Sequence, residues 1–150
     1  MKRHPLHPAM VHLPIAAFVL SPLADLASLF WPGDFFEDSA FLLLAVGLVS
    51  GGLAFATGAL DLRRVRGNQA ERVASLHMLV MFVVWSLALA SLLLRRDSVT
   101  WPPARTLATG LGPVMVLLLV WGAWLGGRLV YEFRTGVVGQ TNAPEETPDA

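Results

Sequence analysis

The amino-acid sequence predicts an all-α membrane protein, a bundle of four transmembrane helices with both termini on the same side. Three observations lead to this prediction. Hydrophobic residues make up 55% of the 150 residues and charged residues only 15%, against about 25% charged in an average soluble chain. The hydrophobic residues are gathered into four runs, each close to the ~20 residues that a helix needs to cross a bilayer. An even number of crossings returns the chain to the side on which it began.

The first predicted span covers residues 8–31, after a short basic lead. Its opening carries two histidines and two prolines, His7, Pro8, His12 and Pro14. Pro8 suits the first turn of a helix. Pro14 removes a backbone N–H and is expected to bend the helix or to mark its true start. A basic start with an apolar core is also typical of a secretory signal peptide, and that alternative stays open.

The remaining spans are expected at residues 35–60, 73–94 and 105–131. Small residues recur over 47–58 and 122–127, which predicts seams where helices pack closely and permits a homo-oligomer. Residues 1–138 are therefore interpreted as one four-helix transmembrane domain. Residues 139–150 are rich in Pro, Glu, Thr, Asn and Asp, and predict a disordered polar tail.

Composition excludes several classes of function. The chain has no cysteine, so disulfides, thiolate catalysis and cysteine-ligated metals are excluded. It has no glycine-rich phosphate loop and no hydrolase or metalloprotease motif. Its basic residues are not interleaved with aromatic residues as a nucleic-acid surface requires. We therefore expect a protein that is not an enzyme, with the lipid bilayer rather than nucleic acid as its partner.

The distribution of basic residues predicts the orientation. On the side of the termini, eight are expected: Lys2, Arg3, Arg63, Arg64, Arg66, Arg72, Arg128 and Arg134. On the other side, three are expected: Arg95, Arg96 and Arg105. Basic residues near membrane spans collect on the cytoplasmic side. The sequence therefore predicts a bacterial inner-membrane protein with cytoplasmic termini.

This topology brings ionisable groups from every helix to one layer at the cytoplasmic side. They are His12, Asp61, His77, Arg128 and Glu132. His12 and His77 each lie about five residues inside their spans, roughly 7 Å at 1.5 Å per residue, so their depths match. Ionisable groups within a membrane usually face the protein interior. The layer is therefore the candidate site.

One interpretation of this layer is a b-type haem. Such a haem needs two axial ligands from different helices at equal depth, and imidazole is the usual ligand. His12 and His77 meet that requirement, and Arg128 or Arg3 is available to pair with a propionate. Substitute ligands on the same side are His7, Met10, Met78 and Met81.

Two other interpretations stay open. A small metal site or a proton-handling site would use His12, His77 and Asp61, with Glu132 in the same layer, because imidazole and carboxylate suit zinc, copper or iron. The other alternative is purely structural, with polar groups that cap helices, meet headgroups and pair with each other without any cofactor.

Asp25 lies within the first span, with Ser21 and Ser28 on its face. A carboxyl group at this depth is either protonated and hydrogen-bonded or paired with a basic group from the outer side. Arg96 and Arg105 are the expected partners. The group is interpreted either as a buried, satisfied carboxyl or as a proton relay.

Aromatic residues are expected at the membrane surfaces. Tyr131 belongs with Trp121 and Trp124 to the belt on the side of the termini. Arg128 follows Trp124 by four residues, so the two are expected to make a cation–π contact that anchors the helix.

Four motifs occur in order along the chain. They are H-P-x-x-V-H-x-P (7–14), T-G-x-x-D (57–61), L-H (76–77) and W-L-G-G-x-L-V-Y (124–131). Together they resemble a bacterial family of four-span membrane proteins without an assigned activity, the domain of unknown function 2231. Some of its members are fused or linked to Rieske or cytochrome-type redox domains, so the resemblance implies electron transfer and a redox partner. The chain departs from the family pattern at Leu13, where phenylalanine is common, and at Arg128, where an acidic residue is usual.

Overall fold

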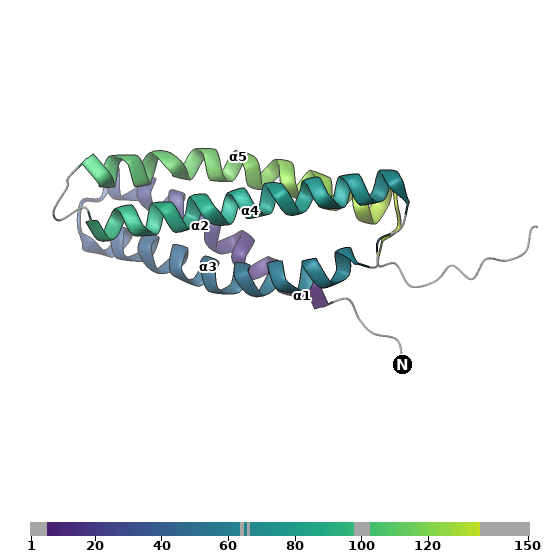
Figure 1. Ribbon diagram of the computed structural model, residues 1–150. Coiled ribbons are helices and arrows are strands. Elements are labelled where there is room, and N and C mark those ends of the chain that lie inside the picture. The colour runs from purple at the N-terminus through teal and green to yellow at the C-terminus, as the bar shows by residue number, and fades with distance from the viewer. Residues whose placement is uncertain (1–5, 64, 66, 98–102, 136–150) are drawn as a thin grey trace, which may run out of the picture.

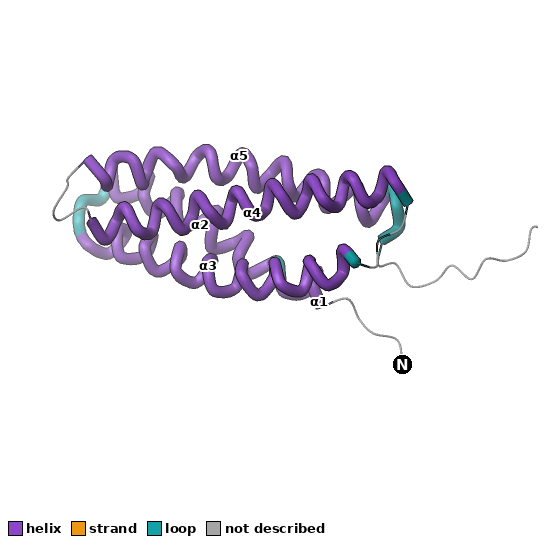
Figure 2. The backbone as a smooth tube through the Cα atoms, viewed as in Figure 1, coloured by secondary structure: helices purple, strands orange, loops and turns teal. Residues whose placement is uncertain are grey.

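The computed structural model describes residues 6–63, 65, 67–97 and 103–135. These residues form five α-helices and, within that part of the chain, no strand (Figures 1 and 2). A short helix, α1 (Leu6–Met10), precedes four long ones. The long helices are α2 (His12–Phe30), α3 (Asp34–Leu62), α4 (Asn68–Asp97) and α5 (Pro103–Tyr131).

Each of the four long helices is long and apolar enough to cross a membrane. Their outer surface is apolar, with large exposed side chains such as Leu29, Phe35 and Leu117, which is the surface that contact with lipid requires. The predicted four-helix membrane bundle is therefore confirmed. The largest difference in bounds is at α4, which begins at Asn68, five residues before the predicted start, because polar residues extend the helix beyond its apolar run. The predicted tail over 139–150 lies outside the described residues.

The chain breaks between α1 and α2 at Val11. Pro14 lacks the N–H that would bond to the carbonyl of Met10, and its ring crowds that carbonyl, which disfavours a continuous helix there. Hydrogen bonds from Val11 N to His7 O (3.2 Å) and from Ile15 N to Val11 O (3.1 Å) lie on either side of the break. The predicted effect of Pro14 is confirmed: α2 begins at His12, and His7 lies on a separate short helix.

The helices pair as two hairpins. In the first hairpin (α1, α2 and α3), α2 packs closely on α3; in the second hairpin (α4 and α5), α4 packs closely on α5. α2 and α4 run in one direction, and α3 and α5 run in the other (Figure 1). One end of the bundle, which we call the histidine end, holds α1, the start of α4 and the ends of α3 and α5. The described termini therefore lie at the same end of the bundle.

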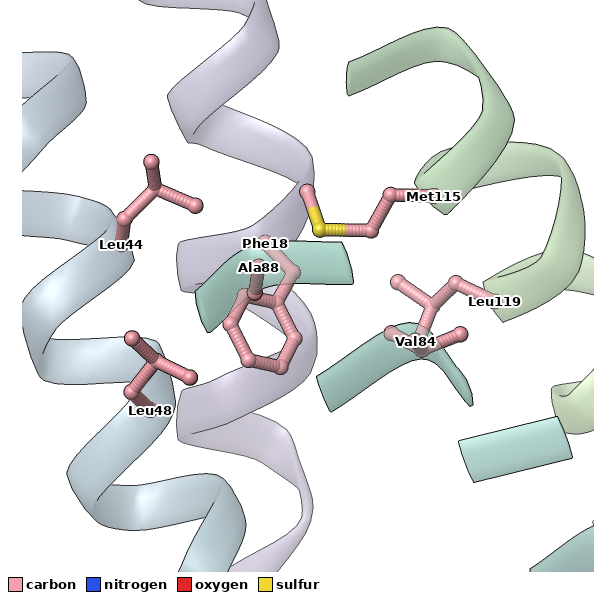
Figure 3. Packing of buried hydrophobic residues seen from close by; sticks show 7 residues of the cluster. All are labelled: Phe18, Leu44, Leu48, Val84, Ala88, Met115 and Leu119. Atoms are coloured by element: carbon pink, nitrogen blue, oxygen red, sulfur yellow. The ribbon is translucent and has the colours of Figure 1, made fainter. Parts of the chain in front are cut away.

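A hydrophobic cluster fills the middle of the bundle (Figure 3). Its buried members are Phe18, Leu44, Leu48, Val84, Ala88, Met115 and Leu119. The ring of Phe18 packs against bare backbone at Gly47, where an added Cβ would lie 2.5 Å from a ring carbon. Gly51 and Gly122, which belong to the two predicted seams, similarly lie against Trp85 and Met81 of α4. Much of the predicted small-residue seam is thus used for packing inside the chain.

Candidate functional site

Two histidines from different hairpins enter the interior at the histidine end. His7 Nδ1 lies 2.8 Å from the carbonyl oxygen of Ala54 in α3, and His77 Nδ1 lies 2.8 Å from that of Gly122 in α5. A carbonyl oxygen only accepts hydrogen bonds, so each Nδ1 carries the proton and donates it. In its neutral form, a ring with the proton on Nδ1 keeps a lone pair on Nε2, which is then the atom available to bind a ligand.

Each imidazole also lies against a glycine of the helix that receives its hydrogen bond. A Cβ added at Gly58 would lie 3.0 Å from His7 Cε1, and one added at Gly126 would lie 3.3 Å from His77 Cε1. Contacts this short leave little room for a side chain at either position. The two glycines therefore allow the rings to approach the backbone closely enough to reach their carbonyl partners.

The two imidazoles line one cavity of about 300 Å³ between the hairpins, partly open to the surface of the bundle. The lining is mainly apolar and includes Phe18, Trp85, Met78 and Met81. Trp85 is held by a hydrogen bond from Nε1 to the carbonyl of Leu48 at 2.9 Å. Among the described residues, neither imidazole Nε2 has a hydrogen-bond partner. The cavity thus combines two nitrogen ligands with an apolar wall.

The structure does not bring His12 and His77 together. His12 is exposed, and its Nδ1 lies 3.4 Å from the carbonyl of Ala9. The buried face of α2 begins at Pro14, and a residue two positions earlier is turned by about 200° on a helix of 100° per residue. His12 therefore points away from the bundle, and His7, one of the expected substitutes, occupies the interior position.

The expected metal set is not assembled either. Asp61 is half-buried at the end of α3 and does not line the cavity. Among the residues that the structure describes, no three His, Asp or Glu side chains gather closely enough to hold a metal ion. The structure therefore does not bring His12, His77 and Asp61 together in one place.

Arg128, Glu132 and Tyr131 lie outside the cavity. Arg128 Nε donates to both carboxylate oxygens of Glu132 at 2.9 and 2.8 Å. Its guanidinium lies 5.2 Å from the ring centre of Trp124, so the expected cation–π contact is confirmed. Tyr131 is 86% exposed. These residues lie at the surface near the end of α5 and do not line the interior cavity.

Asp25 is buried at the far end of the bundle and is paired with Arg95. Two hydrogen bonds, 2.8 and 2.5 Å long, join the guanidinium to the two carboxylate oxygens. The expected partners are both wrong. Arg96 is exposed, one position and about 100° away from the inner face of α4, and Arg105 pairs with Glu37.

An internal repeat is the signal that would have identified His7. His7 and His77 are 70 residues apart, and so are Trp31-Pro32 and Trp101-Pro102. Ser21 and Ser91 share this spacing, and their hydroxyls donate to the carbonyls of Ala40 and Ala108, each at 3.0 Å. In the second helices of the two hairpins, α3 and α5, equivalent residues are 68 positions apart. The pairs are Ala40 and Ala108, Ala54 and Gly122, and Gly58 and Gly126. The two hairpins are therefore versions of one unit, and His12 has no histidine counterpart in the second.

Fold and surface define an integral membrane protein of four transmembrane helices with an internal two-hairpin repeat. The family model described as "Predicted membrane protein (DUF2231)" matches residues 3–139. The chain belongs to this family, as the motifs predicted. Comparison with curated proteins and with solved structures found no match.

Proposed function

We propose that this membrane protein binds haem b between its hairpins, with His7 and His77 as the axial ligands, and that it serves electron transfer without being an enzyme. One observation carries the proposal. Two imidazoles from opposite hairpins each donate Nδ1–H to a backbone carbonyl, and both residues line the same apolar cavity.

The chemistry of the cavity fits this group. A b-type haem in a helical bundle takes axial imidazoles from different helices. A ligating histidine normally donates its other N–H to a carbonyl or carboxylate, which fixes the tautomer and the ring orientation. An apolar wall suits the macrocycle. When bound, such an iron centre supplies one-electron transfer.

A copper(I) site is the second candidate, and the methionines favour it. Met78 and Met81 line the same cavity as the two imidazoles, and Met78 Sδ lies against the same glycine, Gly58, as His7. Thioether sulfur is a soft ligand that selects copper(I). This set of ligands replaces the carboxylate-containing set expected from the sequence.

The cellular setting is also part of the proposal. The excess of basic residues on the side of the termini supports an inner-membrane location with cytoplasmic termini. The resemblance to a family with redox-linked members supports a Rieske or cytochrome-type protein as the electron-transfer partner.

Optical spectroscopy on the purified full-length protein tests the ligand. The protein is prepared in mild detergent after expression with added haem precursor, and its spectrum is recorded before and after dithionite. We expect a Soret band and sharp reduced bands in the wild type, lost in His7→Ala and in His77→Ala. His12→Ala is the matched control and should keep the spectrum, because His12 points outward.

The other outcomes decide between the alternatives. A colourless wild-type protein that contains one copper per chain, lost in Met78→Leu and in His7→Ala, supports the copper site and overturns the haem proposal. If the protein is colourless and metal-free, and both histidine substitutions leave its helicity and thermal unfolding unchanged, only the structural interpretation remains.

A further inference from the structure

Two ion pairs join the hairpins at the end of the bundle opposite the histidines. Asp25 of α2 pairs with Arg95 of α4, and Glu37 of α3 pairs with Arg105 of α5. In both pairs the acid comes from the first hairpin and the base from the second. At this end the first hairpin therefore contributes the acidic partners and the second the basic ones.

Each of these ion pairs joins a position to its own counterpart in the repeat. Asp25 and Arg95 are 70 residues apart, the spacing that relates His7 to His77. Glu37 and Arg105 are 68 residues apart, the spacing that relates Ala40 to Ala108. In a two-fold arrangement, a position contacts its own copy only near the rotation axis. Because α2 runs parallel to α4 and α3 to α5 (Figure 1), this axis runs along the bundle.

Two identical hairpins that paired about this axis would bring like charges together. Two copies of the first hairpin would bring Asp25 against Asp25 and Glu37 against Glu37, and two copies of the second would bring arginines together. The Asp25 and Arg95 side chains are only 8% and 11% exposed, so like charges at these positions would repel each other where screening by water is weak. Glu37 and Arg105, at 36% and 48%, add a smaller penalty.

The surface around this axis is formed by Asp25 and Glu37 on the first hairpin and by Arg95 and Arg105 on the second. We propose that it is a recognition surface in which charge specifies the partner. It fits a hairpin of the same fold with the opposite charge, and it rejects a copy of itself. Specificity of this kind uses repulsion against the wrong partner together with attraction to the right one. The proposal concerns the association of the two hairpins, and it does not rest on the identity of the ligand in the cavity.

The test uses three full-length variants. The all-acidic variant carries Arg95→Asp and Arg105→Glu, and the all-basic variant carries Asp25→Arg and Glu37→Arg. The charge-swapped variant carries all four substitutions, so each ion pair is reversed but retained. Each is expressed alone, and the all-acidic and all-basic chains are also expressed together with different affinity tags.

We expect the all-acidic and all-basic chains to lose the cooperative thermal transition when each is expressed alone. Expressed together, they should co-purify in a 1:1 complex, because each acidic hairpin then finds a basic hairpin in the other chain. The charge-swapped chain should remain monomeric with a cooperative transition. The proposal is overturned if either like-charged variant is as stable as the wild type. It is equally overturned if the two chains do not co-purify while the charge-swapped chain folds, or if the charge-swapped chain is as unstable as the like-charged ones.

Discussion

His7 and His77 occupy equivalent positions in the two hairpins, and each donates Nδ1–H over 2.8 Å to a carbonyl of the helix packed against it. The acceptors, Ala54 and Gly122, are themselves equivalent in the repeat. Both rings are thus oriented by short hydrogen bonds to backbone atoms, and His7 Nδ1 also lies 3.5 Å from the hydroxyl oxygen of Thr57. Substitutions that displace the backbone contact should therefore disturb the site more than substitutions of neighbouring side chains.

Gly126→Ala tests the close approach of His77 to α5. Its Cβ would lie 3.3 Å from His77 Cε1, so the ring must shift and its hydrogen bond to Gly122 must lengthen. We expect haem to bind on the order of tenfold more weakly, measured by spectroscopic titration in detergent. Gly127→Ala is the control on the same helix, because the nearest atom to its Cβ is 4.0 Å away. Equal affinities in the two variants would contradict the proposed role of Gly126.

Gly47→Ala tests the packing of Phe18 in the middle of the bundle. The new methyl group would lie 2.5 Å from the ring in a fully buried cluster, and overpacking of this kind costs about 1–3 kcal/mol. Gly110→Ala, in open space on α5, should instead be neutral or stabilise by up to ~1 kcal/mol through helix propensity. Thermal unfolding in detergent measures both. A Gly47→Ala protein no less stable than the Gly110→Ala protein would show that the cluster is loosely packed.

Asp25→Ala and Glu37→Ala compare a buried ion pair with an exposed one. Removing Asp25 takes away the carboxylate that accepts two hydrogen bonds from Arg95, whose side chain is 11% exposed, and loss of one partner of a buried ion pair typically costs about 3–5 kcal/mol. Removing Glu37 breaks a pair that is 36% and 48% exposed, and such pairs contribute about 0–1 kcal/mol. The free energy of unfolding should therefore fall much more for Asp25→Ala. Similar losses for the two variants would mean that water reaches both pairs equally.

The orientation can be read with single cysteines because the chain has none of its own. Pro32 lies in the exposed turn between α2 and α3, and Asn68 lies exposed at the start of α4. We expect a membrane-impermeant maleimide to label Pro32→Cys in intact cells and Asn68→Cys only after permeabilisation. The reverse labelling pattern would place the histidine end on the outer side of the membrane.

The pair between Arg128 and Glu132 predicts a pH effect at the end of α5. The hydrogen bond from Arg128 holds the pKa of the Glu132 carboxyl below its ordinary value of 4.5. The pKa of Glu132 is lower in the folded protein than in the unfolded chain. The pair therefore stabilises the protein above pH 4.5, and this contribution is lost as the pH falls through the pKa of the folded state. An NMR titration of Glu132 should show the low pKa, and Arg128→Ala should move it back toward 4.5. An unchanged titration in Arg128→Ala would contradict the assignment.

The fold could be predicted because the length of an apolar run is a direct requirement of the bilayer. The site could be predicted only in part, because it depends on which side of each helix faces inward. A change of one position turns a side chain by about 100°, and that decides between Arg95 and Arg96 as the partner of Asp25. The break at Val11 separates His7 from the helix that carries His12, so spacing along the first span could not show which ring enters the interior. Only the 70-residue repeat links His7 to His77 within the sequence itself.

The Phe18 cluster has a consequence for the passage of molecules through the bundle. Phe18 lines the cavity, and the buried cluster to which it belongs lies between the cavity and the Asp25–Arg95 pair. Packed side chains therefore separate the cavity from the Asp25–Arg95 pair. A path from one end of the bundle to the other would have to open through this cluster, so we expect the architecture to suit retention of a guest rather than its translocation.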